Sequence, residues 1–205
     1  MKKIPSVFQR NYETDRLCRD EATPGCEWVL AGEGVATVKY DGTACMIRDG
    51  KLFKRYDRKV PKKQWQKRRR SGATGPVPLE MFKPAPDGWE ACQEPDQNTG
   101  HWPGWLPVGD GPEDKWHRAI DADRLNDGTY ELVGKAIGGN PYGFDDHRLW
   151  RHGKNVVEVE RTYEAIRAML ESEWDEGLVF YHPDGRMAKV KRKDFGIDWP
   201  GEVGP

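Results

Sequence analysis

Residues 38–59 read VKYDGTACMIRDGKLFKRYDRK and place a lysine just before a turn and a hairpin. Asp49-Gly50 lies between two runs with apolar residues, and an Asp-Gly pair in this setting predicts a two-residue type I′ turn. The small and β-branched residues of 33–40 predict a preceding strand. By itself the KYDG tetrapeptide has two explanations, a surface lysine before an Asp41-Gly42 turn or a nucleophile in a phosphate-binding pocket.

The rest of the chain predicts further strands and one clear helix. Residues 129–137 form a strand pattern, and 176–182 and 187–193 form two more, joined as a hairpin by a Pro-Asp-Gly turn. Apolar side chains that recur on one helical face predict a helix over 157–171. Because strands predominate, the fold class is α+β with largely antiparallel sheets.

The length of 205 residues suits one domain, and we expect residues 1–205 to form it. Residues 71–114 are rich in proline, glycine and tryptophan and are too long for an ordinary connection, so they predict an insertion. We expect Trp89, Trp102 and Trp105 to pack this insertion against the body, although stacking of exposed rings on nucleobases is the alternative.

The charge is unevenly distributed along the sequence. The formal net charge is only −1, from 33 lysines and arginines and 34 acids. Between Lys51 and Arg70, however, eleven lysines and arginines face a single acid, Asp57. This predicts one positive face that could hold a nucleic-acid backbone, with the run from Lys59 to Arg70 at its centre.

Two other classes of protein are disfavoured by the composition. No apolar run approaches the roughly 20 residues that span a bilayer, and no apolar stretch follows the N-terminal lysines. We therefore expect no membrane partner and a soluble, intracellular protein, cytoplasmic by default. The four cysteines include no CxxC pair, which disfavours a zinc ribbon and favours reduced structural thiols.

An ordered set of residues gives KYDG a chemical meaning. The set resembles motifs I, Ia, III, IV and V of the covalent nucleotidyltransferases, the superfamily of ATP-dependent DNA ligases, RNA ligases and messenger-RNA capping enzymes. The resemblance implies a nucleotidyltransferase (adenylyltransferase) fold and a nucleotide site. Its members here are Lys39-Tyr40-Asp41-Gly42, Arg55, Glu131, Glu176-Gly177 and Lys189-Val190-Lys191.

The lysines suit nucleotidyl transfer. A lysine amine attacks phosphorus only when unprotonated, so an ordinary pKa near 10.4 has to be lowered by burial or by neighbouring cations. Lys189 and Lys191 alternate along a strand and therefore share a face, with Val190 directed into the core. They could supply that bias to Lys39 and also stabilise the charge that builds on the phosphate.

The remaining motif residues fit the other parts of ATP. Glu176 is suited to a divalent ion, Mg²⁺ or Mn²⁺, because magnesium takes one or two carboxylates together with substrate phosphates. The resemblance implies that Glu131 binds the ribose hydroxyls. Arginine is a bidentate phosphate donor, and Arg55 and Arg58 are both candidates for the motif Ia position. Asp41 and Gly42 belong to the nucleotide-binding turn by the same resemblance.

Longer phrases narrow the resemblance to one group. They are similar to the small single-domain 5′-3′ RNA ligases of vertebrates, which implies ATP and magnesium dependence and joining of 5′-phosphate to 3′-hydroxyl RNA ends through a lysyl-AMP. Only fourteen residues follow Lys191, so we expect no OB-fold domain. We also expect a monomer. The phrases are KYDGTAC, YDRKVPKKQ, GWEACQEPD, GHWPGWLPV, ELVGKAIGGNPYG and EGLVFYHPDGRMAKVKRKDFGIDWP.

Several alternatives stay open. The chain could join DNA or RNA/DNA-hybrid ends, stop as a stand-alone polynucleotide 5′-adenylyltransferase, or serve as a non-catalytic RNA-binding module. Many RNA ligases have a glutamate immediately before the nucleophile, whereas this chain has Val38. Recognition of adenine would then rest on other groups, and Tyr142 and Trp150 are candidates for stacking on the base.

Overall fold

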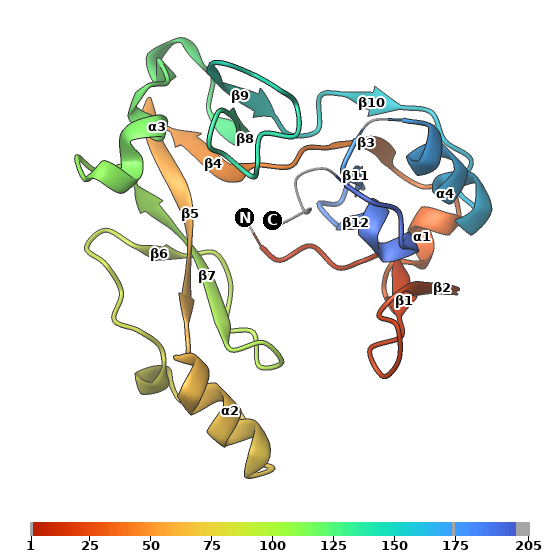
Figure 1. Cartoon of the computed structure of the whole chain (residues 1–205), viewed down its shortest axis with the longest axis horizontal. Helices are drawn as coiled ribbons and strands as arrows, with labels where there is room; N and C mark the ends of the chain where they lie inside the picture. Colours follow the sequence, from red (N-terminus) through yellow and green to blue (C-terminus); the bar gives the residue numbers. More distant parts are fainter. Residues whose placement is uncertain (1, 174, 200–205) are drawn as a thin grey trace. The chain divides into compact units, whose positions relative to one another are not determined.

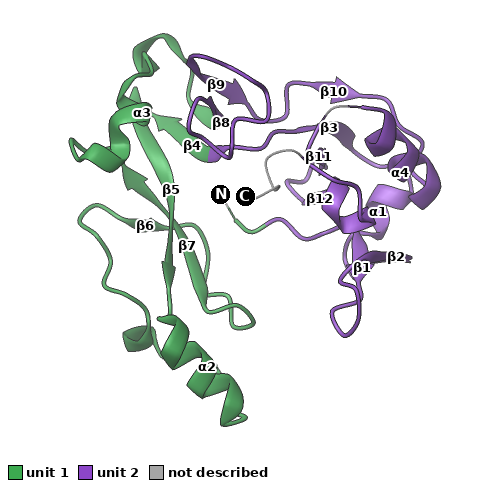
Figure 2. Ribbon diagram, in the orientation of Figure 1, with its two compact units in different colours: residues 1–3, 44–130 green, residues 4–43, 131–205 purple. Residues whose placement is uncertain are grey.

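The computed structural model describes residues 2–173 and 175–199. The chain divides into two compact units, drawn in two colours in Figure 2. Unit 1 contains Met1–Lys3 and Ala44–Tyr130, and unit 2 contains Ile4–Thr43 and Glu131–Pro205. The described residues form mostly antiparallel sheets with few helices and no barrel, so the α+β prediction is confirmed at that level. The assignment to a nucleotidyltransferase fold stays a prediction.

Unit 2 is organised by a four-stranded sheet in the order β10-β3-β11-β12 (Figure 1). Its antiparallel register places Gly177 at the start of β11 opposite Lys39 on one side and opposite Lys191 on the other. The pattern thus brings the first motif and the last onto the strands that flank β11. The four strands are β3 (Val35–Lys39), β10 (Val156–Val157), β11 (Gly177–Tyr181) and β12 (Met187–Lys191).

The core of unit 2 lies against one face of this sheet. Leu178, Phe180 and Val190 are at most 1% exposed, as expected for alternate positions on β11 and β12. They belong to one hydrophobic cluster with Ile166 and Leu170, which lie on the amphipathic helix α4 (Tyr163–Ser172). This burial stabilises one face of the sheet. Lys39, Lys189 and Lys191 lie on the opposite face.

The helix predicted over 157–171 begins later than expected. Residues 156 and 157 pair with β3 as strand β10, and Thr162 then caps α4 by accepting a hydrogen bond from the Ala165 backbone N–H at 3.2 Å. The backbone of an N-cap threonine is extended, so the helix cannot start before the residue that follows Thr162. The prediction was therefore wrong for the first six residues and correct for the amphipathic part.

The smaller elements of unit 2 surround the sheet. Strands β1 and β2 form a second antiparallel pair, and β9 neighbours β8, of which residues 131–134 belong to this unit. These elements are β1 (Phe8–Arg10), β2 (Cys18–Ala22), α1 (Glu27–Leu30), β8 (Gly128–Gly134), β9 (His147–Arg151) and the 3₁₀ helix η4 (Arg192–Phe195).

Unit 1 contains the predicted hairpin and most of the basic run. Asp49 and Gly50 have φ of 53° and 68°, as a type I′ turn requires, and they join the hairpin strands β4 and β5. The strand order is β6-β7-β5-β4. The elements are β4 (Thr43–Arg48), β5 (Lys51–Lys59), α2 (Lys62–Arg70), β6 (Glu90–Ala91), β7 (His101–Pro107) and α3 (Lys115–Arg118), with 3₁₀ helices η1 (Leu79–Met81), η2 (Pro112–Asp114) and η3 (Ala122–Arg124).

The insertion at 71–114 contributes a full strand to unit 1. Strand β7 pairs with β5 over seven residues although it contains Pro103 and Gly104. Trp105 is buried, the Trp89 indole N–H donates to the Tyr56 carbonyl at 3.0 Å, and the Trp102 indole N–H donates to the Gln93 carbonyl at 2.8 Å. The prediction that these three tryptophans pack is confirmed.

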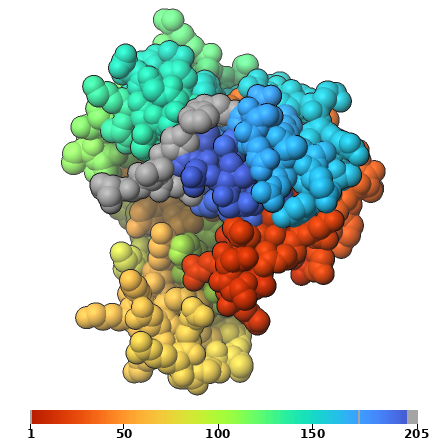
Figure 3. Space-filling view, turned by 45° about the vertical axis from the view of Figure 1, so that its right-hand side comes forward, coloured from red at the N-terminus to blue at the C-terminus, as the bar shows by residue number. Residues whose placement is uncertain are grey.

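Charge differs sharply between the units. Unit 1 carries 18 lysines and arginines against 13 acids, whereas unit 2 carries 15 against 21, so their formal charges are +5 and −6. Helix α2, gold in Figure 3, lies at the surface of unit 1 and has no buried residue. Within the described ranges no helix is long and apolar enough to cross a bilayer.

Candidate active site

Lys39 and Lys191 converge on the carboxylate of Glu176. The Lys39 ammonium binds Oε2 and the Lys191 ammonium binds Oε1, and Lys39 also donates to the Tyr40 carbonyl at 3.1 Å. The Glu176 side chain is only 4% exposed. Burial alone would raise the pKa of Glu176, but the charges of Lys39 and Lys191 outweigh it and lower the pKa. The carboxylate is therefore held ionised between two cations.

Gly177 makes this convergence possible. A Cβ at Gly177 would lie 2.1 Å from the Val190 carbonyl oxygen and 2.9 Å from the Lys191 Cα. The backbones of β11 and β12 thus approach too closely for any side chain at this position. This close approach explains why a glycine follows Glu176. Only glycine fits opposite Lys191 at the first position of β11.

Lys189 is the third lysine on the same face. It precedes Lys191 by two residues on β12, and its backbone pairs with residues 5–7 of unit 2. Burial and the positive charges of Lys191 and Lys39 lower the pKa of Lys189 to about 8. The shift falls on Lys189 itself, and the predicted effect of Lys189 and Lys191 on Lys39 stays a prediction.

The KYDG turn is held by aromatic side chains from two other segments. The Asp41 backbone N–H donates to the Tyr142 hydroxyl at 2.7 Å, and the Trp199 indole N–H donates to Asp41 Oδ2 at 2.7 Å. Burial raises the pKa of Asp41 against the opposing effect of the Trp199 hydrogen bond. A Cβ at Gly42 would lie 2.2 Å from the Leu132 carbonyl oxygen, so the turn packs directly on β8.

Tyr142 and Trp150 belong to one aromatic cluster beside this turn. Their ring centroids are 4.9 Å apart, and Trp150 also packs on Tyr40 at 4.5 Å and on Phe144 at 5.4 Å. Burial raises the pKa of Tyr142, which keeps its hydroxyl neutral. Both candidates for base stacking thus lie next to the predicted nucleophile, and their role toward adenine stays a prediction.

Glu131 is paired with a histidine that sequence reasoning did not identify. The Nε2 atom of His152 lies 2.8 Å from Glu131 Oε2. A Cβ at Gly42 would also come within 3.0 Å of the Glu131 Cγ, which places this carboxylate beside the KYDG turn. The residues of unit 2 that the sequence predicted for one site do lie together: Lys39, Asp41, Gly42, Glu131, Glu176, Lys189 and Lys191.

Arg55 and Arg58 belong to unit 1. Arg55 Nε donates to Asp57 Oδ1 at 2.5 Å, within a pocket of about 330 Å³ that His101 also lines. Arg58 lies over the rings of Trp102 and Trp89, at 4.7 and 5.0 Å from their centroids, and donates to the Lys83 carbonyl. Their expected part in nucleotide binding stays a prediction.

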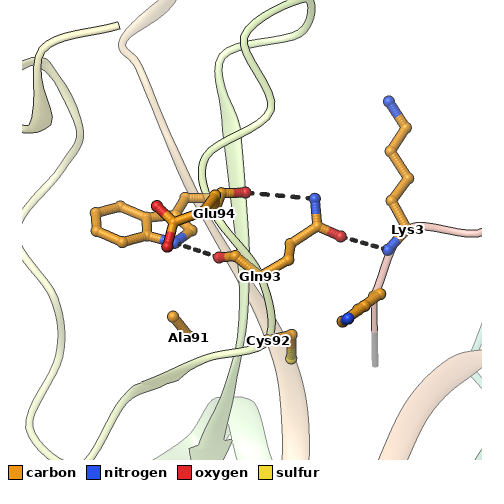
Figure 4. Close-up of a pocket in the computed structure, with 7 residues that line it drawn as sticks. Lys3, Ala91, Cys92, Gln93 and Glu94 are labelled. Carbon is orange, nitrogen blue, oxygen red and sulfur yellow. Dashed lines mark hydrogen bonds between the residues drawn. The ribbon is translucent and has the colours of Figure 1, made fainter. Parts of the chain in front are cut away.

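A second pocket of unit 1 is drawn in Figure 4. It has a volume of about 630 Å³ and lies beside Trp102. The Gln93 side chain crosses it, accepting from the Lys3 backbone N–H at 2.6 Å, while the Gln93 carbonyl accepts from Trp102. Packing therefore already engages Trp102, which fits its assignment as an anchor of the insertion.

The described residues contain no cluster of three or more histidine, cysteine or acidic side chains that could bind a metal by themselves. A divalent ion at Glu176 would take its other ligands from phosphates and water. This donor set fits magnesium, which usually retains several waters and binds one or two carboxylates.

Comparison with known proteins gives the family. No family model matches the sequence. The chain is 31% identical to RNA ligase 1 of Mus musculus over 270 aligned positions, which cover 97% of this chain and 81% of the mouse protein. It is 30% identical to RNA ligase 1 of Rattus norvegicus and 27% identical to that of Danio rerio, each with 97% of this chain and 82% of the relative covered. The chain therefore belongs to the vertebrate-type RNA ligase 1 family.

Proposed function

We propose that the chain is an ATP-dependent RNA ligase that joins 5′-phosphate and 3′-hydroxyl RNA ends, with Lys39 as its nucleophile. The observation that carries this proposal is the convergence of Lys39 and Lys191 on the buried carboxylate of Glu176. Membership of the RNA ligase 1 family supports RNA as the substrate.

The reaction would have three phosphoryl-transfer steps. The deprotonated amine of Lys39 attacks the α-phosphorus of ATP, the bond to the β-phosphate oxygen breaks, and pyrophosphate leaves. An oxygen of the RNA 5′-phosphate then attacks the phosphorus of lysyl-AMP, and the P–N bond breaks. Finally the RNA 3′-hydroxyl loses its proton and attacks the 5′-phosphorus, and AMP leaves. Such transfers depend mainly on positioning and charge neutralisation.

The other lysines would provide that neutralisation. Lys191 lies next to the nucleophile through their shared partner Glu176, and Lys189 extends the same positive face. Preorganised cations in a partly buried site stabilise developing charge more strongly than cations in water do. We assign Lys189 and Lys191 to the α-phosphate of ATP.

Glu176 would hold the divalent ion, Mg²⁺ or Mn²⁺. When bound, such an ion neutralises phosphate charge and favours departure of pyrophosphate. The chain's own contribution is a buried, ionised carboxylate beside the nucleophile.

RNA would bind through the cations of unit 1. Helix α2 presents Lys63, Lys67 and Arg70 along one surface pocket of about 470 Å³. Spacings of three and four residues place side chains on one helical face. Phosphates would replace counterions there, so this contribution falls as the salt concentration rises. Arg55 and Arg58 are assigned to phosphate binding in the same unit.

The decisive experiment is transfer of label from α-³²P-ATP to the protein in the presence of magnesium, read after denaturing electrophoresis. The wild type should keep the label, and Lys39→Arg should lose it, because arginine keeps the positive charge but does not deprotonate. Lys154→Ala, an exposed lysine of unit 2, is the matched control and should label normally. A folded wild type that takes up no label would overturn the proposal.

End-joining assays then test the substrate. Sealing of RNA ends is expected to exceed sealing of matched DNA or hybrid ends. Release of adenylylated 5′ ends without sealing would instead identify a polynucleotide 5′-adenylyltransferase.

A further inference from the structure

We propose that His152 is a positioning residue, which holds the Glu131 carboxylate for the ribose hydroxyls of ATP. This inference rests on the proposed function and adds to it a residue that the motif pattern does not contain. It starts from the 2.8 Å contact between His152 Nε2 and Glu131 Oε2.

Both partners of this contact are largely removed from water. The side chains of Glu131 and His152 are 12% and 14% exposed. A carboxylate at this depth loses much of its hydration and needs a donor in exchange. The imidazole supplies that donor to Oε2, which fixes the plane of the carboxylate. The contact uses Oε2, and we assign Oε1 to the ligand.

The location of the pair connects it with the nucleotide site. Glu131 lies against Gly42, because a Cβ added to Gly42 would come within 3.0 Å of the Glu131 Cγ. Gly42 is the last residue of the tetrapeptide that begins with Lys39. On the other side the negative charge of Glu131 adds to burial in raising the pKa of Tyr181 to about 12. The carboxylate is thus enclosed by strand residues and the KYDG turn, all of unit 2.

The backbone around His152 fits a fixed ring. The histidine follows β9 directly, and Gly153 after it has a φ of 72°, which most side chains avoid. A Cβ at Gly153 would meet the Tyr181 ring at 3.6 Å, so the turn packs against β11. The His152 side chain therefore projects from a turn that packs against β11.

A second observation indicates an unfilled hydrogen bond here. The Nδ1 atom of His152 is buried and has no hydrogen-bond partner among the described residues. Buried polar atoms in folded proteins almost always have a partner, in the protein, in water or in a ligand. A ribose offers two adjacent hydroxyls, each able to donate and accept. We assign one of these hydroxyls to the Glu131 carboxylate, and His152 acts on it only through its contact with Glu131.

A hydroxyl-deletion cycle tests the inference. The rate of lysyl-AMP formation is measured in single turnovers against the concentration of ATP, 2′-deoxy-ATP and 3′-deoxy-ATP, for the wild type, His152→Ala and His152→Gln. With ATP, His152→Ala should raise the half-saturating concentration about tenfold, because the Glu131 carboxylate loses a hydrogen bond to a charged group, and should leave the saturated rate within about twofold. His152→Gln retains an N–H donor and should restore most of the affinity.

The analogues separate positioning from a general structural role. With the deoxy analogue that lacks the hydroxyl bound by Glu131, wild type and His152→Ala should have nearly equal half-saturating concentrations. An equal penalty for ATP and both analogues would overturn the inference, while wild-type labelling would leave the proposed function intact. Absence of labelling in the wild type would overturn both.

Two controls guard against misfolding. His147→Ala changes a histidine on β9, the strand that His152 follows, and should bind all three nucleotides as the wild type does. If His152→Ala does not fold, His152→Phe and Glu131→Gln provide the same cycle, because the first keeps a ring without the donor and the second keeps the shape of the carboxylate and weakens its bond to the ring. An unchanged preference for ATP in both of these variants would contradict the inference.

Discussion

Lys39 and Lys191 lie opposite the same residue, Gly177, on the two strands that flank β11, and bind different oxygens of Glu176. A sheet register thus sets the spacing of two cations around one carboxylate. Strand pairing places the two lysines, whereas Glu176 lies directly before β11, so perturbations of the pairing and of the charges should have separable effects.

Glu176→Gln should destabilise unit 2 strongly. The change keeps the side-chain shape but leaves two ammonium groups facing a neutral amide, close to Lys189. Breaking a buried ion pair by removing one partner costs roughly 3–5 kcal/mol. Urea unfolding at pH 7 measures the loss, and a decrease below about 1 kcal/mol would contradict the described pairing. Glu164→Gln, an exposed glutamate on α4, is the control and should change little.

Lys189→Met should raise stability at neutral pH. The pKa of Lys189 is lowered from 10.5 to about 8 in the folded chain, so the unfolded chain binds more protons between these values. Protonated Lys189 therefore opposes folding below pH 8, and the penalty is relieved as the pH rises toward 10.5. The full shift corresponds to about 3 kcal/mol.

The pH dependence of the difference between the two proteins is the measurement. Urea unfolding from pH 7 to pH 10 should show Lys189→Met ahead by 1–3 kcal/mol, roughly, at pH 7 and converging with the wild type at the alkaline end. Titrating groups distant from Lys189 cancel in the difference, whereas Lys39, Lys191 and Glu176, which interact with it, contribute to the difference. A constant difference across this range would show that Lys189 is not the group responsible.

Gly177→Ala should disrupt the site through the backbone. The added Cβ would lie 2.1 Å from the Val190 carbonyl oxygen, so β11 and β12 have to separate. Overpacking of this kind typically costs about 1–3 kcal/mol, and the lysyl-AMP yield should fall as Lys191 moves away from Glu176. Gly109→Ala is the matched control, because a Cβ there meets nothing closer than 3.7 Å. Equal stability of the two variants would contradict the close approach.

Trp199→Phe should loosen the KYDG turn. The ring is retained, but the N–H that donates to Asp41 Oδ2 at 2.7 Å is lost. A partly buried carboxylate left without this donor costs about 1–3 kcal/mol, and slower lysyl-AMP formation should accompany the loss. Trp116→Phe in unit 1 is a control that should keep the wild-type labelling rate. A wild-type labelling rate in Trp199→Phe would show that the hydrogen bond between Trp199 and Asp41 does not help to position Lys39.

The Lys63→Ala, Lys67→Ala and Arg70→Ala triple variant should reduce the salt dependence of RNA binding. If each cation neutralises one phosphate of a single strand, the slope of log K against log salt should fall in magnitude by about 2. Fluorescence anisotropy with labelled RNA from 50 to 300 mM salt, roughly, measures the slope. Arg124→Ala, an exposed cation paired with Asp121, is the comparison. An unchanged slope would remove α2 from the RNA interface.

Local sequence signals predicted the parts of the fold that local chemistry determines. Asp49-Gly50 and the 183–185 turn define their hairpins because these turns need residues with a positive φ. Asp49, Gly50 and Gly185 have such values, and glycine and aspartate tolerate them better than most residues. The strand β7 was missed because Pro103 and Gly104 weigh against a strand, and only pairing with β5 overrides them. The start of α4 was misplaced for a similar reason, since residues 156 and 157 take their conformation from β3.

The candidate site divides in the same way. The order of the motifs indicated Lys39, Glu176 and Lys191, and the structure brings their charged groups into contact. The partners of Asp41 and Glu131 could not be predicted, because Trp199 is 158 positions from Asp41 and no motif includes His152. A histidine directly followed by glycine at a strand end was the one signal available, and it is too common to single out a residue.

The division of charge between the units has a consequence for the chain in solution. A pI near 6.5 describes a sum of +5 and −6, so the molecule behaves as two oppositely charged halves. At low ionic strength the cationic half of one copy should attract the anionic half of another, and at about 0.15 M salt the screening length of roughly 8 Å weakens this attraction. Added salt would then have two effects. It would separate copies of the chain that associate through their opposite charges, and it would also weaken RNA binding to the lysines and arginines of unit 1.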